Sequence, residues 1–112
     1  MTKIIQITDC HLLRDEEELF SGISPDVHLK GILSLAAKEN PDILLLTGDL
    51  SQDATDEAYQ RLLGYLKIID CPIYFIPGNH DDSQICNENL INHQIQRETV
   101  LELGSWQLVF LD

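Results

Sequence analysis

Residues 41–49 read Pro-Asp-Ile-Leu-Leu-Leu-Thr-Gly-Asp, a short apolar run held between a proline and a glycine. The run from Ile43 to Leu46 is too short for a helix, so we predict a strand that is buried on both faces. A carboxylate, Asp49, follows the strand almost at once. Strands of this kind are typical of parallel sheets with helices on their faces, which predicts an α/β fold.

Two further apolar runs lie on either side of this strand in the sequence. Residues 3–7 form a β-branched run that stops at Thr8-Asp9, and residues 73–76 form a run that stops at Pro77. Both are predicted to be short strands. Because the segments between the three runs have helical character, the order is strand, helix, strand, helix, strand. This order implies parallel strands joined by right-handed crossovers, with helices covering the sheet.

The two segments between the strands carry the start and stop signals of helices. The first begins at Ser24, which can cap a helix that has Pro25 in its first turn, and ends before Pro41. Its apolar positions are expected to be Val27, Ile32, Leu35 and Ala36. The cap of the second helix is expected at Asp53 or Asp56. The apolar side of the second helix is expected to comprise Tyr59, Leu62, Leu63, Leu66 and Ile69.

The chain after the third strand gives weaker signals. Residues 83–95 are weakly helical, and residues 99–111 are typical of a β-hairpin around Gly104. Trp106 and Phe110 alternate along the second strand of this hairpin, so both are expected in the core.

A cluster of polar side chains follows each of the three apolar strands. The clusters are Asp9-Cys10-His11, Gly48-Asp49 and Gly78-Asn79-His80-Asp81. Folds of this class bind ligands beyond the carboxyl ends of their strands, so we expect the three clusters to meet there. Carboxylate, imidazole and amide ligands suit Mn, Fe or Zn, and they contain too little thiolate for a structural zinc site.

Two divalent metal ions are expected at this site. In Asp9-x-His11, the alternation of an extended segment would place both side chains on the same side, where they can hold one ion. Asp49 has two oxygens and can bridge that ion to a second one, to which Asn79 would add a neutral oxygen. Gly48 and Gly78 permit sharp or positive-φ turns that let the backbone pass close to the metal cluster.

The ordered motifs resemble those of a known superfamily. Asp9-x-His11, Gly48-Asp49 and Gly78-Asn79-His80-Asp81 look like the first three motifs of the calcineurin-like metallophosphoesterases. Three longer stretches resemble the bacterial 3',5'-cyclic AMP phosphodiesterase branch of that superfamily: 6–12, 47–53 and 77–81. The resemblance covers essentially the whole chain.

This resemblance implies a mechanism and a role for each site residue. The implied metal ligands are Asp9 and His11 for the first ion, Asp49 for both ions and Asn79 for the second. A metal-bridging hydroxide would attack phosphorus in line with the departing ester oxygen. His80 would stabilise the phosphoryl oxygens or protonate the leaving group, and Asp81 is expected to orient His80.

The resemblance also implies a fold, the N-terminal half of a four-layer αββα sandwich, with a mainly parallel βαβαβ unit followed by a β-hairpin. Later family motifs, an isolated histidine and Gly-His-x-His, have no counterpart, since His28 and His93 match neither. Residues 1–112 are therefore expected to form a truncated metallophosphoesterase domain. Its exposed sheet face and edge would call for pairing with another copy or with a complementary C-terminal half.

The composition restricts the partners and the compartment. A formal net charge of −12, from 19 acidic and 7 basic residues, argues against binding a nucleic-acid backbone or an anionic membrane through bulk charge. A small anion can still bind where carboxylates hold divalent ions. The three cysteines lack paired spacing, and no signal peptide or membrane-spanning run is present, so we expect a cytoplasmic protein.

The leading hypothesis is a metal-dependent phosphoesterase that acts on a small phosphodiester, with a cyclic nucleotide as the first candidate. The alternatives are a non-catalytic metal-binding module and a structural subunit that joins another chain. Other polar residues have simpler interpretations: a solvated loop for 15–18, surface positions for His28 and His93, and packing for Cys10.

Overall fold

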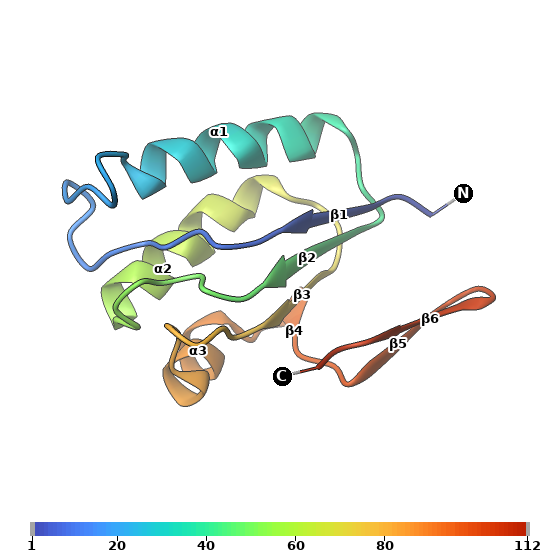
Figure 1. The fold of residues 1–112 in the computed structure, drawn as a ribbon. Coiled ribbons are helices and arrows are strands. Elements are labelled where there is room, and N and C mark those ends of the chain that lie inside the picture. Colours follow the sequence, from blue (N-terminus) through green and yellow to red (C-terminus); the bar gives the residue numbers. More distant parts are fainter. Residues whose placement is uncertain (1, 112) are drawn as a thin grey trace.

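The computed structural model describes residues 2–111, which form a four-stranded parallel sheet with three α-helices packed along one face (Figure 1). The sheet order is β1-β2-β3-β4, comprising β1 (Ile4–Ile7), β2 (Ile43–Thr47), β3 (Ile73–Ile76) and β4 (Ile95–Gln96). The helices are α1 (Pro25–Lys38), α2 (Asp56–Tyr65) with the 3-10 turn η1 (Leu66–Ile68), and α3 (Ser83–Leu90). The separate antiparallel hairpin consists of β5 (Val100–Leu103) and β6 (Trp106–Val109). This architecture confirms the predicted α/β fold of a parallel βαβαβ unit followed by a β-hairpin.

The helix starts follow local hydrogen-bonding rules. Ser24 caps α1 with Pro25 in the first turn, as predicted. The expected cap of α2 at Asp53 or Asp56 is wrong, because the Thr55 side chain accepts the backbone N–H three residues ahead. Asp56 instead lies in the first turn, where a negative charge complements the helix dipole.

Helix α1 buries a different face from the one that the sequence suggested. Leu29 and Leu33 are buried together with Ala36, whereas Val27 and Leu35 are 68% and 66% exposed. Ile32 is 41% exposed. These three buried residues are four and three positions apart, so they lie on successive turns of the helix along the face that packs on the sheet. The helix carries two apolar stripes, and its packing against the sheet determines which of them is buried.

The core lies between the sheet and the helices. Leu44 and Leu46 of β2 and Phe75 of β3 are fully buried against Tyr59 and Leu62 of α2. The predicted apolar side of the second helix is confirmed, since its members are buried apart from one that is partly buried. Because the core lies between the sheet and the helices, the polar side chains that follow the strands lie outside it, at the carboxyl ends of the strands.

The C-terminal third differs from the prediction in two places. The segment Ile95–Gln96 pairs with β3 as a parallel strand, although this region was expected to be weakly helical, and the helix covers only Ser83–Leu90. Two residues of strand are too few to leave a periodic pattern. Trp106 was expected in the core but is 78% exposed, because the tip of the hairpin extends away from the sheet (Figure 1). Phe110 is half-buried beside Tyr74, with ring centroids 6.2 Å apart.

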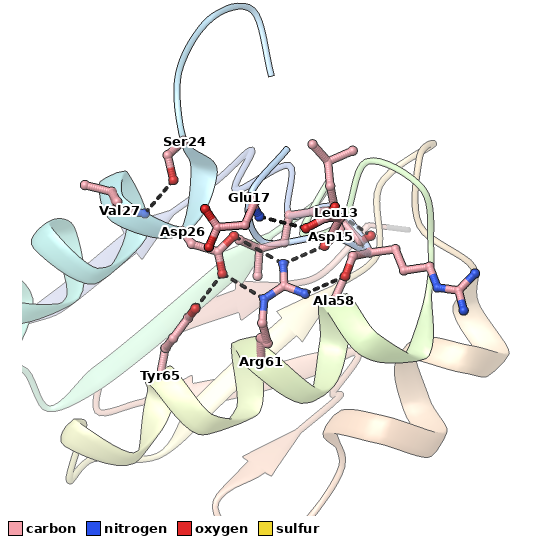
Figure 2. Close-up of polar contacts among 12 residues, drawn as sticks. Leu13, Asp15, Glu17, Ser24, Asp26, Val27, Ala58, Arg61 and Tyr65 are labelled. Atoms are coloured by element: carbon pink, nitrogen blue, oxygen red, sulfur yellow. Dashed lines mark hydrogen bonds and ion pairs between the residues drawn. The ribbon is translucent and has the colours of Figure 1, made fainter. Parts of the chain in front are cut away.

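A buried ion pair joins α1, α2 and the loop between β1 and α1 (Figure 2). Asp26 is 3% exposed and accepts bonds from Nε of Arg61 at 2.8 Å and from the Tyr65 hydroxyl at 2.5 Å. Arg61 also donates to the backbone carbonyls of Leu13 and Arg14. Burial raises the pKa of Asp26, but the bonds from Arg61 and Tyr65 outweigh burial and hold this pKa below its ordinary value. The ion pair therefore anchors the loop that leads out of the first polar cluster.

Candidate metal centre

The loops after β1 and β2 bring the predicted ligands of the first metal ion together. Asp9 and His11 follow β1, and Asp49 follows β2. One ligand atom of each residue lies within 4.8 Å of the others, and Nε2 of His11 is 3.3 Å from Oδ1 of Asp9. Ligand atoms that each lie about 2.1 Å from one ion are separated by about 3 to 4 Å, so only small side-chain shifts are needed to hold it.

The backbone of these ligands is left-handed. The φ angles are 60° at Asp9, 50° at His11 and 50° at Asp49. The expected extended alternation of Asp9-x-His11 is therefore wrong, although the two side chains do converge. Bonds from Asp9 N to Gly48 O at 3.0 Å and from His11 N to Asp49 O at 2.9 Å hold the two loops side by side. Such conformations are rare outside glycine and concentrate at functional sites.

Gly78 allows the third loop to pass directly beneath Asp49. A Cβ atom built on Gly78 would lie 2.3 Å from both the backbone N and Oδ1 of Asp49, which no side chain can tolerate. Gly48 adds a positive φ of 92°, which favours glycine. The backbone N–H of His80 then donates to Oδ1 of Asp49 at 3.0 Å. The third loop is thus fixed against the residue that is expected to bridge two ions.

The amide of Asn79 lies against the carboxylate of Asp49. With its nitrogen turned toward Asp49, the amide donates to the two carboxylate oxygens at 3.1 and 3.2 Å. With its oxygen turned there, three oxygens converge, an arrangement that is stable only around a cation. The Asn79 amide therefore lies beside Asp49 and remains a candidate ligand for a second ion.

The electrostatics of the cluster favour a divalent cation. A hydrogen bond from the Thr8 hydroxyl, 2.6 Å from Oδ2 of Asp9, lowers the pKa of Asp9; burial opposes this effect, and the nearby His11 adds to it. Asp9 is thus an anion at neutral pH. Carboxylate and imidazole ligands with an amide oxygen fit a borderline metal such as Mn, Fe or Zn.

His80 borders the cluster without joining the three convergent ligands. Its ring is exposed and lies edge-on to the ring of His11, with centroids 5.8 Å apart and an interplanar angle of 70°. Its backbone is held by the hydrogen bond from its N–H to Asp49, and its side chain is exposed. His80 is therefore positioned to approach a group that is bound at the cluster.

The expectation that Asp81 orients His80 is not supported. The Asp81 carboxylate accepts bonds from the backbone N–H groups of Leu50, Ser51 and Gly78 at 2.8 to 3.0 Å, and from the Tyr59 hydroxyl at 2.7 Å. Within residues 2–111, no hydrogen bond joins it to the side chain of the neighbouring histidine. Asp81 instead ties the loops after β2 and β3 to helix α2.

Two residues near His11 were not predicted. The imidazole stacks on Phe20, with ring centroids 4.8 Å apart and an interplanar angle of 8°, and its Nδ1 is 2.7 Å from Oε1 of Gln52. Gln52 lies in a stretch that was matched to the cyclic AMP phosphodiesterase branch, but no role was assigned to it. Phe20 had no sequence signal, because it follows an acidic loop and its position depends on a turn at Ser21 and Gly22.

The residues that were given simpler interpretations stay outside the cluster. His28 and His93 are exposed, and so is the acidic loop of residues 15–18. Cys10 packs against the core, and burial raises the pKa of its thiol to about 12. A pocket of 260 Å³ opens beside the metal ligands, and its walls are mostly apolar side chains of β1, α1 and the turn that carries Phe20.

A comparison with protein families decides the family of this chain. The family model described as calcineurin-like phosphoesterase matches residues 2–109. The chain belongs to this family. The match spans all three loops of the metal centre, so the predicted superfamily is confirmed together with the fold that it implies.

The curated relatives of this calcineurin-like phosphoesterase are named as phosphodiesterases. A 3',5'-cyclic adenosine monophosphate phosphodiesterase of Haemophilus influenzae is 37% identical over 113 residues, covering 98% of this chain and 41% of the relative. A 3',5'-cyclic-nucleotide phosphodiesterase of Nostoc sp. is 35% identical over 111 residues, covering 97% of this chain and 42% of the relative. The chain therefore spans about two fifths of the length of these relatives. In the described part of the chain, no helix is both long enough and apolar enough to cross a membrane.

Proposed function

We propose that this chain supplies the metal-binding half of a metal-dependent phosphodiesterase that acts on 3',5'-cyclic nucleotides. The observation that carries the proposal is the convergence of Asp9, His11 and Asp49, whose ligand atoms lie within 4.8 Å of one another. The family membership and the names of the relatives support a phosphoester substrate. Residues 1–112 would then form the N-terminal half of the domain.

The proposed roles follow from the positions of the side chains. Asp9 and His11 would hold one divalent ion, Asn79 would hold a second, and Asp49 would contact both. Bound divalent ions would neutralise the phosphate charge and lower the pKa of a water molecule, which supplies a nucleophile at neutral pH. His80, exposed at the rim, would donate a hydrogen bond to the phosphoryl oxygens or a proton to the departing oxygen.

Two further features support a small anionic substrate in a reducing compartment. With a net charge of −12, the chain repels nucleic-acid backbones, whereas ions bound at the cluster would create a local positive site for one phosphate. Cys10, Cys71 and Cys86 are all free thiols. Free thiols persist in the cytoplasm, which we propose as the location.

The test is hydrolysis of cyclic AMP and of an aryl phosphodiester with added Mn²⁺. We expect metal-dependent turnover that is reduced at least about 100-fold in Asp49→Ala, because that change removes the shared ligand. Asp70→Ala removes the same charge from an exposed loop before β3, at the opposite end of the sheet, and should leave turnover unchanged. Equal loss in both variants, or turnover that persists in Asp49→Ala, would contradict the proposed site.

A second candidate is a metal-binding or scaffold module without activity that pairs with another chain. The exposed apolar side chains of the hairpin region favour it, since Trp106, Val109 and Leu111 are 78%, 57% and 82% exposed. This candidate predicts Mn²⁺ binding, or assembly with a partner, without any hydrolysis. Metal-dependent turnover by the 112-residue chain would exclude it.

A further inference from the structure

We propose that Gln52 is a positioning residue that fixes the tautomer of His11 and so prepares its Nε2 to bind metal. The inference rests on the proposed metal site and adds a residue to it. Nδ1 of His11 is 2.7 Å from Oε1 of Gln52, whereas Nε2 lies on the side of the carboxylates, 3.3 Å from Oδ1 of Asp9. The ring therefore lies between two accepting oxygens, an amide oxygen at Nδ1 and a carboxylate oxygen at Nε2.

The tautomer follows from the hydrogen-bonding capacity of each partner. An amide oxygen only accepts, so Nδ1 must carry the hydrogen when it faces Oε1 of Gln52. In a neutral ring, Nε2 then carries a lone pair that points toward Asp9 and Asp49. Without Gln52, the nearby carboxylates would favour the opposite tautomer, with the hydrogen on Nε2, which cannot bind a metal ion.

Two hydrogen bonds to one carbonyl hold the backbone around Gln52 in place. Its N–H donates to the carbonyl of Leu12 at 2.8 Å, and the buried hydroxyl of Ser51 donates to the same carbonyl at 2.9 Å. Because Leu12 directly follows His11, these bonds tie Gln52 to the segment whose ring it contacts. These two hydrogen bonds fix the backbone of residues 51–52 and so hold the Gln52 amide near Nδ1 of His11.

The imidazole also has little freedom to rotate away. Phe20 covers one face of the ring at a centroid distance of 4.8 Å, and the side chain of His11 is only 18% exposed. Two backbone bonds between Phe20 and Ile23, at 2.8 and 3.0 Å, close the tight turn that holds Phe20 there. The stacked ring restricts rotation, and Gln52 selects which nitrogen carries the hydrogen.

The first measurement is the tautomer of His11 in the metal-free chain, read from imidazole ¹⁵N chemical shifts. We expect the Nδ1–H form in the native chain and in Gln52→Glu, which keeps an acceptor. Gln52→Leu should shift the population to the Nε2–H form. Gln60→Leu makes the same change on the exposed surface of α2, where Gln60 bonds Asn89, and should leave the tautomer unchanged.

The second measurement is the Mn²⁺ affinity of the same four proteins by calorimetry. Gln52→Leu should bind at least about 10-fold more weakly, in line with the loss of a residue that orients a histidine ligand. Gln52→Glu should bind at least as tightly as the native chain, and Gln60→Leu should match it.

The outcomes separate the role of Gln52 from the proposed function. An Nε2–H tautomer in the native chain, or an unchanged tautomer in Gln52→Leu, overturns the inference whether or not any variant binds metal. If Gln52→Leu fails to fold, an Nε2–H tautomer in the native chain or in Gln52→Glu still overturns the inference. Absence of Mn²⁺ binding in a native chain with the Nδ1–H tautomer would contradict the proposed metal site, but it would not contradict the effect of Gln52 on the tautomer.

Discussion

At the scale of single residues, Gly78 shows how tightly the metal centre is built. The backbone of Asp49 crosses Gly78 so closely that a Cβ atom would lie 2.3 Å from both its nitrogen and Oδ1. The obstructing atoms include backbone and cannot swing aside like the end of a flexible side chain. Asp49 can therefore occupy its observed position only because residue 78 has no side chain.

The predicted effect of Gly78→Ala is a loss of Mn²⁺ binding together with a destabilisation of about 2 kcal/mol, because overpacking displaces Asp49. Gly64→Ala is the matched control, since Gly64 lies in α2 and a Cβ atom there meets nothing within 4 Å. This control should bind Mn²⁺ normally and gain about 0.5 to 1 kcal/mol of stability. Calorimetry and urea unfolding measure both quantities, and normal Mn²⁺ binding by Gly78→Ala would refute the packing argument.

At the scale of elements, the ion pair of Asp26 and Arg61 joins α1, α2 and the loop that ends in the Phe20 turn (Figure 2). The pKa of Asp26 is lowered in the folded chain. A carboxyl group with a lowered folded-state pKa contributes stability above its unfolded pKa of about 3.9, and this stability is lost as the pH falls through the folded-state value. The anchoring of the loop should therefore weaken in acid.

Asp26→Asn tests this linkage by urea unfolding between about pH 7 and pH 3. At neutral pH the variant should be less stable than the native chain by about 3 kcal/mol, because Arg61 is left without its charged partner. The difference should begin to narrow as the pH falls below the unfolded pKa of about 3.9, and it should vanish only below the lowered pKa of the folded carboxyl group. A stability difference that stays constant across this range would show that Asp26 contributes through packing alone.

The sequence predicted the elements that carry strong local signals. The strands β1, β2 and β3, the cap of α1 and the hairpin turn each follow from a few adjacent residues. The buried face of α1 and the strand β4 did not, since the first depends on which of two apolar stripes meets the sheet and the second has only two residues. The exposure of Trp106 depends on where the hairpin extends, which no local pattern specifies.

At the scale of the whole molecule, the parallel sheet explains why the convergence of the candidate metal ligands was predictable. Parallel strands end at one edge, so three polar clusters separated by about 30 to 40 residues along the chain meet there. The contacts that support the ligands were not predictable in the same way. The contacts of Gln52 and Phe20 with His11 depend on how the side chains are oriented in the folded chain. Asp81 accepts hydrogen bonds from the backbone of the loops, and this role too is visible only in the three-dimensional structure.

The central claim is that the edge of this sheet binds divalent metal through Asp9, His11 and Asp49. The most direct measurement is anomalous X-ray scattering from crystals of the chain that have been soaked in Mn²⁺. The account predicts a peak about 2.0 to 2.2 Å from the ligand atoms of these three residues, and a second peak beside Asn79 and Asp49. Absence of any peak at this edge at saturating Mn²⁺, or peaks confined to other acidic residues, would contradict it.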